Sequence, residues 1–129
     1  METSQRNAVA TAEAPGPYPI LSQAVVHNGL VFTSGSIGMD PKTNTLVEGS
    51  IAERTIQALT NMTKVLEAAG SGSGKILKVI IYVTSMDDVP VMNEAYKAFF
   101  AEPRPARACV CVKALARGTD IEMECTGFI

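Results

Sequence analysis

The run Ile76-Leu77-Lys78-Val79-Ile80-Ile81-Tyr82-Val83 is almost entirely apolar, and Lys78 is its single charged residue. It is rich in valine and isoleucine, the β-branched residues that favour strands. A nearly continuous apolar run of this length is typical of a strand with both faces covered. We therefore predict a central β-strand over residues 76–83 and place the other elements around it.

A helix is predicted before this strand. Ser50 and Glu53 have the spacing of a capping box, in which the serine oxygen accepts from the first turn and the glutamate reaches back. Apolar residues then recur every three or four positions, as on one stripe of a helix: Ile56, Leu59, Met62, Leu66 and Ala69. Gly70 is placed to end this helix. The connector 70–75 resembles a phosphate-binding loop but lacks its Gly-x4-Gly-Lys-Ser/Thr order, so we interpret it as a flexible connector.

A second helix and two further strands are predicted after the central strand. Asp87 and Pro90 suit a helix start, and Pro103 stops that helix. Residues 107–112 are predicted to form a strand. Residues 121–128 alternate between apolar and polar side chains, the period of a strand with one buried face.

A β-hairpin is predicted at the other end of the chain. Residues 24–27 and 30–34 are rich in strand formers and flank Asn28-Gly29, a strong hairpin turn signal because both turn positions need positive φ. The element order is therefore β-β-α-β-α-β-β, an α+β fold. Two helices cover only one face of such a sheet, so we expect a partner subunit on the other face.

The length and composition fit one folded domain. The chain has 129 residues, of which 47% are hydrophobic and 19% charged. Residues 1–129 are predicted to be a single domain, with residues 1–12 as a flexible start. The net charge of −2 argues against a general nucleic-acid binder, which needs a basic face. No apolar run reaches the length of a membrane span.

The cysteines and the single histidine limit the chemistry. Three cysteines cannot all pair within one chain, so we expect free thiols in a reducing compartment. That compartment is predicted to be the cytoplasm, with the mitochondrion as the alternative. One histidine, His27, excludes a His-rich metal site and a mechanism that needs two histidines in one subunit.

Arg107 and two glutamates are the main candidates for a functional site. An arginine on an apolar strand needs an anion, either a ligand carboxylate or a glutamate in a structural salt bridge. Glu122 and Glu124 lie on one face of the last predicted strand. Such a pair indicates water, a cation or a catalytic site, and the alternative is a solvated sheet face.

The remaining candidates have structural alternatives of their own. Cys109 lies on the same face as Cys111 and is either a buried small side chain or a thiol activated by Arg107. Ser34-Gly35 ends a strand and either presents a hydroxyl and N–H groups to a ligand or forms a plain turn. Tyr18 is either a ligand-binding residue or an aromatic that anchors the start of the domain. Asn93 is either a ligand-binding residue or a surface amide.

Five short motifs occur in the order and at the separations found in one known family: Gly16-Pro17-Tyr18, Phe32-Thr33-Ser34-Gly35, Asn93-Glu94-Ala95-Tyr96 with Phe99-Phe100, Pro105-Ala106-Arg107-Ala108-Cys109-Val110 and Ile121-Glu122-Met123-Glu124. Through them, residues 13–129 resemble the Rid/YjgF family, formerly called the endoribonuclease L-PSP family. The sequence is most similar to the RidA subgroup of imine deaminases and to its fungal mitochondrial-maintenance homologues.

The resemblance implies a chorismate-mutase-like α+β fold and a homotrimer whose three sites lie in clefts between subunits. It implies an enzyme that needs no cofactor and no metal. That enzyme hydrolyses reactive 2-imino acids and their enamine forms, such as 2-iminobutanoate and 2-iminopropanoate, to 2-keto acids and ammonia. Pyridoxal-phosphate enzymes such as threonine dehydratase release these imines.

The resemblance also implies residue roles. Arg107 would clamp the substrate carboxylate as a bidentate pair, and the backbone N–H of Cys109 would line the same pocket. Glu122 would hold and polarise the attacking water. The other substrate-binding residues would shape the pocket, some from the neighbouring subunit: Tyr18, Ser34, Gly35 and Asn93.

Two segments depart from the family pattern. The family usually has Ser-Gly-Gln-Ile-Pro where this chain has Ser34-Gly35-Ser36-Ile37-Gly38, and commonly Leu-Pro-x-Gly where it has Leu115-Ala116-Arg117-Gly118. Neither departure changes Arg107 or Glu122. Both would alter loops near the cleft, so we expect them to affect substrate preference more than activity.

Two other functions stay open at this point. Relatives have also been described as ribonucleases that inhibit translation, although a net negative charge and one histidine disfavour RNA as the substrate. A non-catalytic metabolite-binding or chaperone-like trimer could use the same arginine pocket without turnover.

Overall fold

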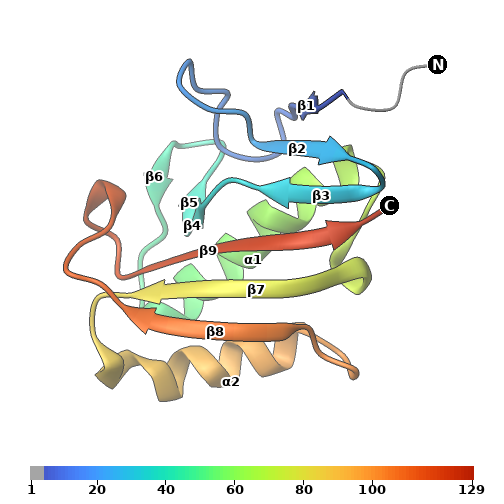
Figure 1. Cartoon of the computed structure of the whole chain (residues 1–129). Coiled ribbons are helices and arrows are strands. Elements are labelled where there is room, and N and C mark those ends of the chain that lie inside the picture. The colour runs from blue at the N-terminus through green and yellow to red at the C-terminus, as the bar shows by residue number, and fades with distance from the viewer. Residues whose placement is uncertain (1–4) are drawn as a thin grey trace.

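The computed structural model describes residues 5–129. Its main elements are one large sheet and two helices that pack on one face of that sheet (Figure 1). The strands run in the order β1-β2-β3-β9-β7-β8, and β4 pairs with the same edge of β9 as β3. The sheet contains β1 (Asn7–Val9), β2 (Ala24–His27), β3 (Leu30–Thr33), β4 (Ser36–Ile37), β7 (Ile76–Val83), β8 (Ala106–Cys111) and β9 (Ile121–Phe128). Among the strands of residues 5–129, only β7 and β8 are parallel neighbours.

The predicted strand over residues 76–83 is confirmed as β7, which lies between β9 and β8. Val79, Ile81 and Val83 are completely buried in the core that the sheet shares with the helices. Ile80 and Tyr82 point to the opposite face and are half-buried. The helices cover one face of this strand, whereas its other face is only partly buried within the described residues.

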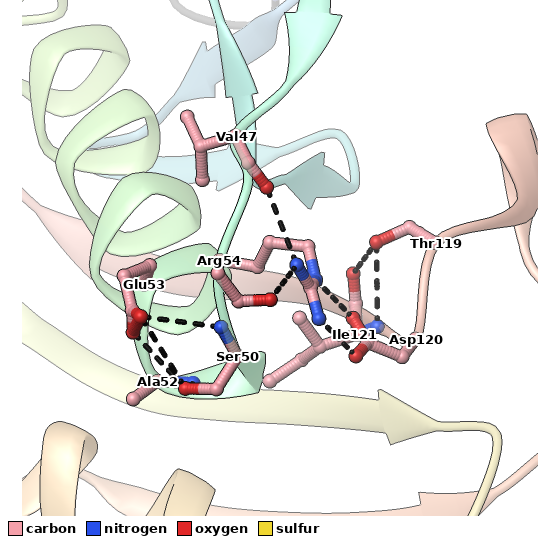
Figure 2. A network of polar contacts seen from close by, with 9 residues as sticks. Val47, Ser50, Ala52, Glu53, Arg54, Thr119, Asp120 and Ile121 are labelled. Atoms are coloured by element: carbon pink, nitrogen blue, oxygen red, sulfur yellow. Dashed lines mark hydrogen bonds and ion pairs between the residues drawn. The ribbon is translucent and has the colours of Figure 1, made fainter.

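Both predicted helices are confirmed, and they lie on one face of the sheet as the α+β prediction requires. They are α1 (Ile51–Ala68) and α2 (Val89–Phe99), and they pack against each other. The capping box is present: the Ser50 hydroxyl oxygen accepts from the Ala52 N–H at 3.1 Å, and the Glu53 carboxylate accepts from the Ser50 N–H at 3.1 Å (Figure 2). The chain also contains the short 3-10 helices η1 (Ser73–Lys75), η2 (Met86–Asp88) and η3 (Ala116–Gly118).

The chain start differs from the flexible segment expected for residues 1–12. Residues 1–4 lie outside the described residues, whereas Asn7–Val9 forms β1 and pairs antiparallel with β2. Gln23 then holds the next loop: its side chain accepts from the Thr11 N–H at 2.6 Å and donates to the Pro15 carbonyl at 2.9 Å. A strand of three residues is too short to show a periodic pattern, and its backbone pairing with β2 leaves no signal in the sequence.

The loop after β3 also contains structure that the sequence pattern did not indicate. A small separate hairpin joins β5 (Met39–Asp40) to β6 (Thr45–Leu46). The two strands are too short for a period of two to be visible. Among residues 5–129, no helix combines the length and the apolar character that crossing a bilayer requires.

The face of the sheet opposite the helices is apolar and open. Phe32, Val110 and Phe128, from three different strands, are 43%, 44% and 39% exposed. Register places all three on the face that also carries Glu122 and Glu124. An apolar sheet face without a covering layer is typical of a surface that packs against another subunit.

Candidate active site

A cavity of about 460 Å³ opens between α1 and the loop that joins β3 to β4. Four predicted site residues line it: Tyr18, Ser34, Gly35 and Glu122. Much of the remaining wall is apolar and includes Met39, Met62 and Val65. A largely apolar hollow with a few polar groups is the usual form of a small-molecule site.

Glu122 reaches this cavity from β9. Its carboxyl group lies directly against Gly35, where any Cβ atom would collide with it. Burial raises the pKa of Glu122, and the charge of Glu124 raises it further. Glu124 itself accepts a hydrogen bond from the Tyr82 hydroxyl at 2.7 Å. The two glutamates, equivalent in the sequence pattern, therefore have different surroundings.

Ser34 and Tyr18 come from two adjacent loops at the cavity wall. The Ser34 hydroxyl donates to the Ser22 carbonyl at 2.6 Å, and the Ser34 N–H donates to the Gln23 carbonyl at 2.9 Å. Since its hydrogen is engaged, the Ser34 hydroxyl can offer the cavity only an acceptor oxygen. Tyr18 is 38% exposed, so part of its ring is free at the rim.

Arg107 lies on β8, away from this cavity, and its side chain rests on α2. One Nη2 hydrogen is donated to Asn93 Oδ1 at 2.6 Å, and the guanidinium carbon is 4.9 Å from the centre of the Tyr96 ring. In the described part of the chain, no carboxylate lies within 4.0 Å of Arg107. The structural salt bridge considered for this arginine is thus not formed within residues 5–129.

Cys109 follows Arg107 on the same side of β8 and packs against the core. Burial raises the pKa of its thiol, and the Arg107 charge opposes that effect only partly. The thiol is therefore protonated at neutral pH, which makes it a poor nucleophile. All three cysteines are free.

The predicted site residues fall into two groups. The cavity group consists of Tyr18, Ser34, Gly35 and Glu122, and the arginine group consists of Asn93, Arg107 and Cys109. No member of the arginine group lines the cavity. Arg107 is in register with Val79, which faces the helices, whereas Glu122 is in register with Tyr82 on the opposite face. Within one chain, Arg107 and Glu122 therefore lie on opposite faces of the sheet, and no residue of the arginine group reaches the cavity.

A sequence model of the family described as Endoribonuclease L-PSP matches residues 11–129. The chain belongs to this family. It is 40% identical over 124 residues to the human protein named 2-iminobutanoate/2-iminopropanoate deaminase, covering 96% of this chain and 90% of the human one. The Rid/YjgF resemblance of the five motifs is thereby confirmed.

Solved structures of L-PSP relatives share the fold. RidA from the Antarctic bacterium Psychrobacter sp. superimposes with a TM-score of 0.91 at 36% identity, covering 95% of this chain and 99% of that one. Escherichia coli TdcF with bound serine gives a TM-score of 0.90 at 31% identity, covering 95% and 98%.

In this L-PSP family chain, an ion pair fixes the strand that carries Glu122 (Figure 2). Arg54 on α1 donates from Nε and Nη2 to the two carboxylate oxygens of Asp120, both at 2.8 Å. Its Nη1 donates to the carbonyls of Val47 and Gly49, at 3.2 and 2.9 Å. Asp120 precedes β9 by one residue, so this pair sets where the strand begins.

Two further polar residues of the L-PSP cavity were missed by the sequence analysis. Asn61, buried on α1, donates to the carbonyls of Ile37 and Met39 at 3.1 and 2.8 Å and so holds the loop after β3. Arg117 adopts a φ of 62° and donates to the Asn44 carbonyl at 3.0 Å. Asn61 lies beside the apolar stripe predicted from the sequence and not within it, so no local signal pointed to its burial.

Proposed function

We propose that this protein is a 2-iminobutanoate/2-iminopropanoate deaminase that hydrolyses 2-imino acids to 2-keto acids and ammonia. The observation that carries the proposal is the 40% identity, over nearly the whole chain, to a human protein of that name. The site geometry supports it: Arg107 is free to bind a carboxylate, and Glu122 is a cavity carboxyl with a raised pKa.

A trimer with sites between subunits is part of the proposal. The cavity group of one subunit and the arginine group of its neighbour would face each other across the interface. Two observations support this assembly: Arg107 and Glu122 lie on opposite faces of one sheet, and the open face exposes large apolar side chains. Light scattering after gel filtration should give about three times the chain mass, and a monomer at micromolar concentration would contradict the assembly.

The proposed reaction needs one positioned water and a proton carrier. Arg107 pairs with the substrate carboxylate and orients the C=N bond toward Glu122. Glu122 accepts a proton as the water oxygen forms a bond to C2, which yields a carbinolamine. The substrate enters as its protonated iminium form, and Glu122 returns the proton it took from the water to the carbinolamine nitrogen. The C2–N bond then breaks as the C2=O bond forms, and the hydroxyl proton leaves with the ammonia, so that one iminium and one water give the 2-keto acid and ammonium. The carboxyl ends the cycle ionised, as it began.

The raised pKa of Glu122 suits both halves of this cycle. A carboxylate in water is a weak base, whereas partial burial makes its protonated form easier to reach. Imines already hydrolyse in water, so orientation and one proton carrier are sufficient catalysis. The other cavity residues shape the pocket around the substrate: Tyr18, Ser34 and Gly35.

A coupled assay tests the proposal. A threonine dehydratase generates 2-iminobutanoate, and the formation of 2-oxobutanoate is followed in a buffer low in free amines, with and without this protein. Acceleration that scales with protein concentration is expected. An unchanged rate at micromolar protein would overturn the activity, and RNA cleavage in a parallel assay would favour the ribonuclease alternative.

A further inference from the structure

The guanidinium of Arg107 is held on two sides by residues of α2. Asn93 Oδ1 accepts from Nη2 at 2.6 Å, and the Tyr96 ring centre is 4.9 Å from the guanidinium carbon. Residues three apart on a helix share one face, so Asn93 and Tyr96 together form one contact surface for the guanidinium. The amide restrains one edge of the guanidinium and the ring restrains its planar face.

The Tyr96 ring is itself buried in the core. Tyr96 is only 4% exposed, and its ring lies 4.8 Å from that of Phe100, which in turn packs against Phe99 at 5.2 Å. The Tyr96 hydroxyl has no hydrogen-bond partner, although it is buried. The chemical contribution of this side chain toward Arg107 is therefore the face of its ring and not its hydroxyl.

The Arg107 side chain depends on this contact surface for its orientation, because β8 is an edge strand and the residue is exposed. A free arginine side chain samples many rotamers, and ordering it when a ligand binds weakens affinity. An aromatic face attracts and orients a guanidinium. The contacts with Asn93 and Tyr96 leave the other N–H donors of Arg107 available for a carboxylate.

We propose that Tyr96 is a positioning residue, whose buried ring fixes the plane of the Arg107 guanidinium so that its free edge is presented to the substrate carboxylate. This inference rests on the proposed function in so far as Arg107 binds that carboxylate. Tyr96 acts through Arg107 and does not touch the substrate. Its loss should weaken carboxylate binding and leave the hydrolytic step at Glu122 largely unaffected.

Three variants test the role. Tyr96→Phe keeps the ring face, whereas Tyr96→Met fills a similar volume without it. Phe100→Met is the matched control, since it removes a buried ring of the same cluster that does not contact Arg107. We expect Tyr96→Met to raise both the KM for 2-iminobutanoate and the Kd of 2-oxobutanoate, measured by calorimetry, about 10-fold, the scale of a lost cation–π contact once the bound ligand and the neighbouring subunit of the proposed trimer cover Arg107. Its kcat should change less than about 3-fold, and Tyr96→Phe and Phe100→Met should bind within about 2-fold of wild type.

A second readout does not depend on any ligand. The Nε–H resonance of Arg107, followed by nitrogen-edited NMR, should be shifted by the Tyr96 ring current in wild type and Tyr96→Phe and should lose that shift in Tyr96→Met. An unshifted wild-type resonance, wild-type affinity in Tyr96→Met, or equal weakening in Phe100→Met would overturn the positioning role. If wild type binds 2-oxobutanoate but hydrolyses no imine, the proposed function fails, and the resonance and the affinities still decide the role of Tyr96.

Discussion

At the scale of single residues, Glu122 and Gly35 form one unit of the site. The Glu122 carboxyl occupies the space that a side chain at position 35 would fill. The same close packing removes water from the carboxyl and raises its pKa. Glu124 shares the strand face but is engaged by the Tyr82 hydroxyl. The catalytic role proposed for Glu122 thus makes separate predictions for each of these positions.

Replacement of Glu122 by glutamine should abolish most of the turnover. Glu122→Gln keeps the shape but cannot accept the proton of the water, so we expect kcat to fall about 100-fold or more with little change in KM. Glu124→Gln should keep its rate and instead lower the melting temperature, because it loses a charged acceptor for Tyr82. Steady-state kinetics in the coupled assay and thermal melts measure both. A dead Glu124→Gln beside an active Glu122→Gln would reverse the assignment.

A methyl group at position 35 should displace the Glu122 carboxyl. Gly35→Ala places a Cβ where the Glu122 carboxyl now lies. We expect kcat to fall at least about 10-fold, because a shift of a catalytic group by about 1 Å can cost about 100-fold. Gly74→Ala is the matched control, since nothing lies within 4 Å of a Cβ there. Equal rates in both variants, measured at saturating imine, would show that the contact is dispensable.

At the scale of elements, β9 is fixed at its start by the pair between Arg54 and Asp120. Both side chains are largely buried, with 18% and 25% exposure, and the contact is bidentate. The Arg54 guanidinium lowers the pKa of Asp120 below its ordinary 3.8. Because Asp120 lies two positions before Glu122, the ion pair stabilises the register of β9 that places Glu122 at the cavity.

Loss of this charge should cost stability in a pH-dependent way. Asp120→Asn removes a partly buried charged acceptor, so we expect a loss of about 2 kcal/mol in the free energy of unfolding at pH 7. The folded-state pKa of Asp120 is lowered, so its contribution is fully present above the unfolded value of 3.8 and is lost as pH falls through the lower folded value. Denaturant unfolding from pH 7 to pH 2.5 should therefore show the wild type approaching the variant only below about pH 4. A difference that does not depend on pH would assign the stabilisation to packing.

Elements with local signals could be predicted, and elements without them could not. The turn at Asn28-Gly29 and the capping box of Ser50 are encoded within a few residues, and both formed as predicted. Strand β1 and the hairpin of β5 and β6 are too short to show a period, and distant side chains such as Gln23 and Asn61 hold their surroundings.

The same limit applies to the site. The motif residues were named from the sequence, and the structure places four of them at one cavity. Tyr96 reads as one more apolar position of a helix stripe, and nothing local shows that its ring faces Arg107. That Arg107 and Glu122 lie on opposite faces of the sheet depends on strand order and register, which only the folded chain reveals.

At the scale of the whole molecule, the central claim is that each site combines Arg107 of one subunit with Glu122 of another. The chain alone separates the two groups and leaves an apolar sheet face open. In a cyclic trimer, every interface would be the same and would complete one site. A chain that lacks Arg107 and a chain that lacks the Glu122 carboxylate should each be inactive alone, and a mixed trimer of the two should contain one complete site.

Subunit complementation between Arg107→Ala and Glu122→Gln measures this directly. The two chains are co-expressed with different tags, and trimers that carry both tags are compared with each parent in the coupled assay. In any mixed trimer, one interface of three joins an intact Arg107 to an intact Glu122, so the purified hybrids should recover about one third of the wild-type rate. Parent proteins mixed only after assembly serve as the control and should stay inactive. Hybrids no more active than their parents would contradict a site shared between subunits.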